Sequence, residues 1–551
     1  MPEENVKGRE FKFATHVPKD VSGGRDFHIV KEVLHYEDGT VKPNLRMIYD
    51  FERPFYITKQ PYRNHKQKKE YELLSKVNRY MTTESDLVKN VAMRLGKHPR
   101  MVKSKRDILS DPYVYWLDIS SCSILNAAYA KKYPDFITPY SYAVLDIEAN
   151  IDTKDLTILT IMFKRMIRTF IWNDYDSRVR DTKEIRDKLR KLYIEHTPKG
   201  TPDNFRDVDI EYYYRDTQID MIVEAFRFLH EWKPDFLGVW NIDYDISIMM
   251  KIIKNCGMSY EDVFCDPAVP KQYRYFKYVK GPTVKKKETG EEQTLKPHER
   301  WNYCISTASF TMVDSMQVYN FVRAGQQQVP GGYGFDNILR KETNVHKLEF
   351  KDVGAVPGSP DWHRLMTKKF PLEYIVYNQW DNVDMLILDD NIKDMQSSLP
   401  TLCGITEISN FNSSPRKVVD DLHFFYLERG CVLGTKDPKA DKDGILGKRD
   451  WIVTLPSSRL EENGLKCLDG LDKVRTSLRA FVYDVDAISS YPNNILSSNM
   501  SKSTTKNELV AIEGMTKHEF MYENIDLVCG DVNAMKYCQT MMEFPDLHEF
   551  A

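Results

Sequence analysis

The stretch Ser141-Tyr-Ala-Val-Leu-Asp-Ile-Glu148 is an apolar run that ends in two carboxylates. Such a run predicts a buried β-strand, and alternation along a strand puts the side chains of Asp146 and Glu148 on one face. Two neighbouring carboxylates repel each other unless a cation lies between them, so the pair suggests a Mg²⁺ site. Asp-x-Glu also arises by chance in a chain with 81 acidic residues, so other motifs must support this interpretation.

Helices and a second strand are expected after this first strand. Apolar residues at helical spacing predict helices over 181–193, 220–232 and 373–392. Pro234-Asp-Phe-Leu-Gly-Val-Trp240 predicts another strand. Strands that alternate with helices indicate an α/β layer.

The second strand is followed by Asn241-Ile-Asp-Tyr-Asp245 and then by an apolar helix expected over 246–253. Asp245 is therefore expected at or near a helix N-terminus, where an aspartate often serves only as a cap. Asp243 is the alternative functional carboxylate, but the aromatic residue beside Asp245 favours Asp245.

A third motif, Tyr377-Asn-Gln-Trp-Asp381, lies within the last predicted helix. The spacing of four residues places Tyr377 and Asp381 on the same helix face, which alone is typical of an ordinary amphipathic helix. Taken together, the three motifs supply four carboxylates, enough to hold two metal ions about 3.5–4 Å apart for in-line attack on a phosphodiester. A nearby tyrosine hydroxyl can orient the attacking water.

These three motifs resemble the Exo I, Exo II and Exo III motifs of family B DNA polymerases, most closely those of T-even-like bacteriophages. Residues 333–339 are similar to the family's segment ahead of Exo III. The resemblance implies an RNase-H-like 3′→5′ exonuclease domain with two Mg²⁺ ions, for which Mn²⁺ can substitute. It implies that the metal ligands are Asp146, Glu148, Asp245 and Asp381, that Tyr377 orients the water, and that Asn241 contacts substrate. The spacing in Exo II is one residue shorter than in that phage group and is similar to the protein-primed branch.

A fourth motif, Phe481-Val-Tyr-Asp-Val-Asp486-Ala-Ile-Ser-Ser-Tyr491-Pro-Asn, predicts a strand that runs into a turn. It resembles motif A of the same family, although Ser490 replaces the usual Leu and Asn493 the usual Ser. The match implies that Asp486 binds the catalytic metals and that the backbone near Ser489 and Ser490 meets the nucleotide triphosphate. Tyr491 would pack under the deoxyribose and exclude a 2′-hydroxyl.

No fingers motif and no Asp-Thr-Asp-Ser hairpin follow motif A. We therefore expect the N-terminal piece of a split polymerase, which adds nucleotides only with a second chain; a cut in a longer protein is the alternative. The expected partners are primer–template DNA and single-stranded 3′ ends, deoxynucleotides once the second chain is present, and a sliding clamp reached through that chain. The Met-rich and acidic segment 508–550 is interpreted as a joining surface or a plain insertion.

Size suggests roughly three or four domains, and the fold class expected is α/β multidomain. An N-terminal α+β domain is expected over 1–138, the exonuclease domain over 139–395, and a linker with an incomplete palm, motif A and a C-terminal extension over 396–551. A Ser/Pro/Asn-rich stretch near 409–415 marks the last boundary. The stretch 62–71 is rich in basic residues and contains tyrosines. It is interpreted as a solvent-exposed surface, with DNA contact as the alternative.

Composition limits the classes of protein that remain. The formal net charge of −3 gives no global nucleic-acid signature, so DNA contact is expected from a local basic surface. The odd number of cysteines, nine, with no CxxC pair, argues against a disulfide framework and against zinc. The charged N-terminus and the lack of a long apolar run predict no signal peptide and no membrane span. A cytoplasmic protein is expected, in the bacterial host if a phage encodes it.

Two other functions remain open. A free-standing 3′→5′ DNA exonuclease has no use for residues 481–492, which argue against it. A non-catalytic DNA-binding subunit with decayed sites is the alternative from another class, and the intact carboxylates in all three exonuclease motifs argue against that one.

Overall fold

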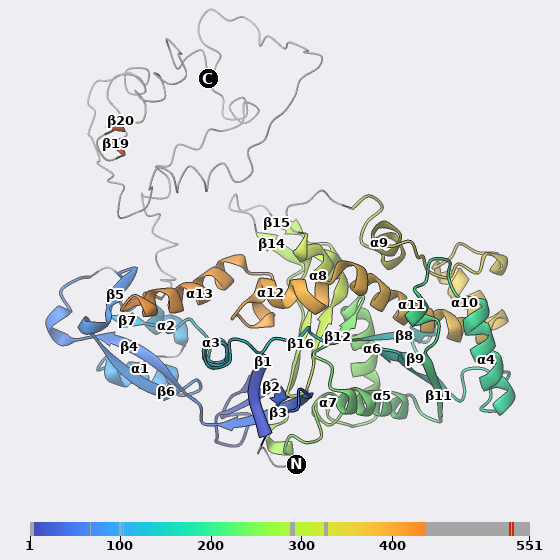
Figure 1. The fold of residues 1–551 in the computed structure, drawn as a ribbon, viewed down its shortest axis with the longest axis horizontal. Coiled ribbons are helices and arrows are strands. Elements are labelled where there is room, and N and C mark those ends of the chain that lie inside the picture. Colours follow the sequence, from blue (N-terminus) through green and yellow to red (C-terminus); the bar gives the residue numbers. More distant parts are fainter. Residues whose placement is uncertain are drawn as a thin grey trace, which may run out of the picture. The chain divides into compact units, whose positions relative to one another are not determined.

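The computed structural model describes residues 5–66, 68–98, 102, 104–286, 292–323 and 329–435, and two short strands further on, β19 (Val528–Cys529) and β20 (Val532–Asn533). The chain divides into two compact units, Met1–Pro438 and Lys439–Ala551 (Figure 1). In the second unit, β19 and β20 form an antiparallel pair. The motif A residues Asp486, Ser489, Ser490 and Tyr491 lie outside the described residues.

The first unit is built around a sheet of eight strands in the order β11-β10-β9-β8-β12-β17-β16-β13. The pairs β10–β11, β8–β12 and β12–β17 are parallel and the others antiparallel, so the sheet is mixed. This confirms the α/β class, while the RNase-H-like fold stays a prediction. The strands are β8 (Tyr142–Ala149), β9 (Leu156–Phe163), β10 (Met166–Trp172), β11 (Asp209–Arg215), β12 (Phe236–Val239), β13 (Phe276–Val279), β16 (Tyr303–Ser306) and β17 (Thr311–Asp314).

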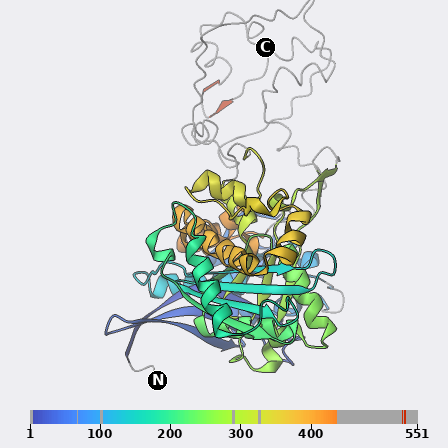
Figure 2. The same cartoon turned by 90° about the vertical axis from the view of Figure 1, so that its right-hand side faces the viewer.

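Helices cover both faces of this sheet (Figures 1 and 2). One face carries α5 (Gln218–Trp232), α6 (Ile242–Asn255) and α7 (Tyr260–Phe264). The other carries α4 (Lys183–Glu195), α8 (Ser315–Val322), α9 (Phe335–Glu342), α10 (Pro360–Lys369) and α11 (Pro371–Ile392). The helices expected over 181–193, 220–232 and 373–392 are thus present as α4, α5 and α11, with slightly shifted ends.

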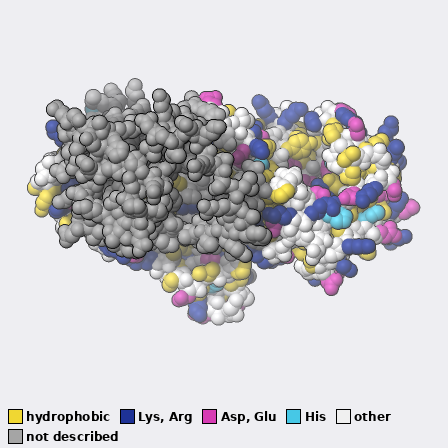
Figure 3. All heavy atoms as spheres, turned by 90° about the horizontal axis from the view of Figure 1, so that it is seen from above, with side chains coloured by type: hydrophobic (Ala, Val, Ile, Leu, Met, Phe, Trp, Pro, Cys, Tyr) yellow, Lys and Arg dark blue, Asp and Glu magenta, His cyan; other side chains and the backbone are white. Residues whose placement is uncertain are grey.

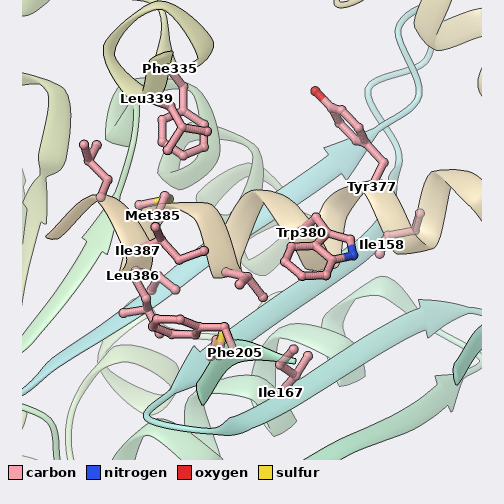
Figure 4. Packing of buried hydrophobic residues seen from close by; sticks show 14 of the residues in the cluster. Ile158, Ile167, Phe205, Phe335, Leu339, Tyr377, Trp380, Met385, Leu386 and Ile387 are labelled. Carbon is pink, nitrogen blue, oxygen red and sulfur yellow. The ribbon is translucent and has the colours of Figure 1, made fainter. Parts of the chain in front are cut away.

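Alternation along β8 decides where its two carboxylates point. Ala143, Leu145 and Ile147 pack into the core under α5 and α6, whereas Tyr142 and Val144 pack into the core under α11. Asp146 and Glu148 continue the second series, so their side chains face α11, as strand geometry requires. Figure 4 shows that α11 presents Leu386 and Ile387 to this core, while the ring of Tyr377 projects from another side of the helix.

The N-terminal part of the first unit has two three-stranded sheets and three helices. They are β1 (Val6–Val17), β2 (Phe27–Tyr36) and β3 (Val41–Tyr49); β4 (Glu52–Thr58), β6 (Val77–Thr83) and β7 (Val114–Tyr115); and α1 (Leu87–Arg94), α2 (Lys105–Leu109) and α3 (Ser121–Lys132). A hairpin of β14 (Val284–Lys286) and β15 (Glu292–Thr294) lies between β13 and β16 in sequence. Among the described residues, no helix combines the length and the apolar character that a membrane crossing needs.

The last described segment of the first unit returns to its N-terminal part. After α12 (Leu399–Cys403) and α13 (Ser414–Glu428), strand β18 (Cys431–Leu433) pairs with β5 (Tyr71–Leu73). On α13, buried Asp420 accepts a hydrogen bond from Ser123 of α3, and His423 contacts Asp118. The boundary expected near 409–415 therefore falls inside the first unit, because α13 packs on the N-terminal part through these buried polar contacts.

Lys31 of β2 joins the N-terminal sheet to the large sheet. Its buried ammonium group donates to the backbone carbonyls of Lys233, Pro234 and Ser309, at 2.7, 3.3 and 3.0 Å. Asp235, whose carboxylate lies 3.7 Å from this ammonium, accepts hydrogen bonds from the backbone and the hydroxyl of Ser141. These contacts tie together the starts of β8 and β12, the two strands that lead to the predicted motifs.

The variant Lys31→Met should unfold more easily than the parent chain, by about 2 kcal/mol or more, because three backbone carbonyls, two of them in buried contacts, lose this donor. Urea denaturation followed by tryptophan fluorescence measures this change. Lys7→Met, at an exposed position on β1, is the matched control and should leave the midpoint unchanged. A midpoint for Lys31→Met equal to that of the parent would contradict the structural role of Lys31.

Candidate metal centre

Three of the predicted carboxylates meet between β8 and α11. Asp146 and Glu148 lie in the second half of β8, Asp381 faces them from α11, and one oxygen of each lies within 4.8 Å of the other two. Glu148 and Asp381 are buried, with 8% and 5% of their surface exposed. Carboxylate oxygens are the donors that Mg²⁺ prefers, so this trio could hold a divalent ion of that kind.

Asp245 lies beside this trio but is not part of it. Its side chain is buried in the first turn of α6, and burial followed by the charge of Asp146 raises its pKa well above the ordinary range. Asp243 instead accepts a hydrogen bond from Tyr278 at 2.9 Å and pairs with Lys280 at 2.8 Å. Of the two candidate aspartates, Asp243 and Asp245, Asp245 is thus the one beside the acidic trio.

Helix α6 begins four residues earlier than the sequence suggests, at Ile242. Asp314, at the end of β17, accepts a hydrogen bond from the backbone N–H of Ile242 at 3.1 Å. A residue distant in sequence therefore satisfies the first backbone N–H of the helix. Asn241 is the N-cap residue, and its side chain makes no capping hydrogen bond. The interpretation of Asp245 as a helix cap is therefore wrong.

Lys347 brings a positive charge to the site, and no sequence motif includes it. Its Nζ lies 2.7 Å from Oδ2 of Asp381 and 4.8 Å from the centre of the Tyr377 ring. Burial opposes its charge, yet Asp381, Tyr377 and Asp146 together hold the pKa of Lys347 well above the ordinary range. A permanently charged ammonium thus partly neutralises the crowded carboxylates.

Two residues of α11 orient the carboxylates of β8. Asn378 donates from Nδ2 to Oδ2 of Asp146 at 2.6 Å, and the hydroxyl of Tyr374 donates to Oε2 of Glu148. Tyr374 lies one helical turn before Tyr377, so its position on the same face could have been found from helical spacing. Asn378 directly follows Tyr377, but nothing in the sequence indicates which way an amide side chain turns.

The crowding of these acids changes their protonation. Burial and then Asp381 raise the pKa of Asp146 to about 7, and burial and then Asp146 raise the pKa of Glu148 well above the ordinary range. The pKa of Asp381 is also raised, mainly by burial, although Lys347 opposes the shift. The site is therefore one that a cation stabilises by replacing protons.

Without metal, the chain should lose stability as the pH rises from about 4 to 7, because the folded protein holds the Asp146 proton more tightly than the unfolded chain does. Mg²⁺ should restore this stability at pH 8, by about 3 kcal/mol at a hundredfold excess over its Kd. Thermal melts at pH 5 and pH 8, with Mg²⁺ or EDTA, measure the effect. A melting temperature that Mg²⁺ leaves unchanged at pH 8 would contradict metal binding at the trio.

A cleft of about 450 Å³ lies along α6, with Asn241 and Tyr244 in its wall. Tyr244 is 40% exposed, and its pKa is raised by burial and then by Glu148, which places it close to the acidic trio. Three basic side chains also line the cleft: Lys154, Lys251 and Arg300. Asp243 lines the cleft as well, and in the view of Figure 3 Lys and Arg on the described surface are likewise interspersed with Asp and Glu.

No protein-family model matches the chain, and a comparison with curated protein sequences finds no match either. The candidate site therefore rests on its own geometry: three converging carboxylates with Asp245, Lys347 and Tyr377 around them.

Proposed function

We propose that this chain shortens DNA from its 3′ end by metal-dependent hydrolysis, as the proofreading part of a family B DNA polymerase. The observation that carries the proposal is the convergence of Asp146, Glu148 and Asp381 from β8 and α11, at positions that the sequence motifs had singled out. Random acidic residues more than 230 positions apart have no reason to meet in a buried site, because burying like charges is costly.

The residues of the site divide into those for metal and those for substrate. Asp146, Glu148 and Asp381 would hold one divalent ion. Asp245 lies close enough to Asp146 for the two carboxylates to ligate a second ion together. Such ions, when bound, activate a water molecule and stabilise charge on the leaving oxygen. The donor set fits them, because it consists of hard oxygen ligands.

The surrounding side chains would position the terminal nucleotide. The hydroxyl of Tyr377 interacts with both Asp381 and Lys347, which supports a role for it in orienting the attacking water. The ammonium of Lys347 would offset negative charge that builds up on a phosphate. In the cleft beside α6, three basic side chains would contact the phosphates of the DNA backbone, and Tyr244 would stack against a base.

The polymerase half of the proposal is supported by sequence alone. Asp486, Ser489, Ser490 and Tyr491 resemble motif A but lie outside the described residues. We propose that nucleotide addition needs a second chain that supplies the remaining palm and the fingers.

A primer–template labelled at the 5′ end of the primer, incubated with the chain, Mg²⁺ and all four deoxynucleotides, tests both halves on one gel. The expected result is a ladder of shortened primers and no extended product. A parallel reaction with the label on the 3′-terminal nucleotide should release labelled mononucleotide at once.

The gel also separates the alternatives. Extension of the primer by this chain alone would contradict the need for a partner. Tight DNA binding without any shortening would favour a non-catalytic DNA-binding subunit over the exonuclease.

A further inference from the structure

Two aromatic side chains outside the sequence motifs, Tyr374 and His363, lie next to the carboxylate of Glu148. The hydroxyl of Tyr374 donates to Oε2 of Glu148, and Nδ1 of His363 lies 2.7 Å from the same hydroxyl. The His363 nitrogen is itself 3.8 Å from Glu148 Oε2, too far for a good direct hydrogen bond. Tyr374 therefore stands between the carboxylate and the histidine.

Helix α10 fixes the histidine of this pair. The helix starts at Pro360, directly after the N-cap residue Ser359. The side chain of Ser359 accepts a hydrogen bond from the backbone N–H of Trp362. Trp362 is fully buried, and its ring meets that of Tyr377 edge-on, with centroids 5.0 Å apart. His363 follows Trp362 directly, so the packing of that indole sets where the imidazole can lie.

Ring packing also restricts Tyr374. Its ring stacks on Tyr377 with centroids 5.9 Å apart and planes 13° from parallel, and His363 meets it edge-on at 5.8 Å. Once its hydroxyl proton points to Glu148, the Tyr374 oxygen is left to accept, so this contact requires the His363 tautomer that carries its proton on Nδ1. Both the ring and the hydroxyl are then held in one arrangement.

We propose that Tyr374 and His363 are positioning residues that hold the Glu148 carboxylate in the orientation needed to ligate a metal ion. This inference rests on the proposed function, because it assigns a task within the same metal centre. A free glutamate side chain has several rotamers, and fixing one costs free energy that would otherwise weaken metal binding. Partners that orient a metal ligand typically change metal affinity or activity by about 10- to 100-fold when removed.

Mn²⁺ titration followed by electron paramagnetic resonance tests the inference without relying on catalysis. Tyr374→Phe keeps the ring and its stacking but removes the hydroxyl, so its Kd for Mn²⁺ should rise about 10-fold or more. His363→Phe should give a smaller rise, and His363→Asn, which keeps a donor near the place of Nδ1, should restore part of the affinity.

Tyr193→Phe is the matched control. Tyr193 is a buried tyrosine of α4 that stacks on Trp380, and its hydroxyl donates to the backbone of Phe205 rather than to a carboxylate. Its loss should lower the melting temperature without changing the Kd for Mn²⁺. A merely structural role for Tyr374 would give the same pattern as this control.

The outcomes distinguish this inference from the proposed function. Equal Mn²⁺ affinity in Tyr374→Phe and the parent would overturn the positioning role while the metal centre stands. Failure of the parent to bind Mn²⁺, or binding that survives Asp146→Asn/Glu148→Gln, would overturn both.

Discussion

The double variant Asp146→Asn/Glu148→Gln should degrade DNA at least about 10³-fold more slowly than the parent chain, a barrier increase of about 4 kcal/mol. Both side chains keep their size and lose their charge, so β8 stays packed while two of the three converging carboxylates become neutral amides. Single-turnover shortening of a 5′-labelled oligonucleotide in Mg²⁺ measures the rate.

The fold of this double variant should survive. Burial and mutual repulsion raise the pKa of both acids, so neutral amides remove an unfavourable interaction, and the metal-free variant should melt no lower than the parent. Glu184→Gln/Asp187→Asn, at two exposed positions on α4, removes the same charge elsewhere and should leave the rate unchanged. Degradation by the β8 double variant at the parent rate would show that the hydrolysis occurs at another site.

Lys347→Met should slow the same reaction by about 10²-fold, the typical cost of removing one group that stabilises developing charge. Its ammonium lies 2.7 Å from Asp381 and next to Tyr377, so its loss removes the nearest counter-charge of the trio and a contact of the Tyr377 hydroxyl. Lys347→Arg keeps the charge and should recover part of the rate.

The control for Lys347 is Lys341→Met. Lys341 pairs with Glu342 at 3.1 Å and is 43% exposed, outside the acidic trio, so its replacement should not change the rate. The melting temperature of Lys347→Met at pH 8 should fall without Mg²⁺, since the carboxylates lose their internal cation. A rate within about twofold of the parent would contradict an electrostatic role for Lys347 in the reaction.

The parts of the site that the sequence could predict are those that depend on local periodicity. Alternation along 141–148 placed Asp146 and Glu148 on one face of a strand, and helical spacing placed Tyr377 and Asp381 on one face of a helix. Both patterns depend only on residues close in the chain, which is why they could be interpreted without a structure.

The parts that could not be predicted depend on contacts between distant segments. Lys347 comes from the stretch after α9 and carries no signal that separates it from the many other lysines of the chain. The start of α6 was misplaced because the backbone of Ile242 donates to Asp314, a residue far away in sequence. The packing of α13 on α3 depends on distant residues in the same way and cannot be deduced from composition.

We propose that Asp146, Glu148 and Asp381 together hold a divalent metal ion. Crystals of the chain soaked in Mn²⁺ and measured at the manganese absorption edge would locate the ion directly by its anomalous scattering, with no need for activity. We predict a peak bounded by these three carboxylates. Manganese peaks elsewhere on the chain with none among these residues would contradict it.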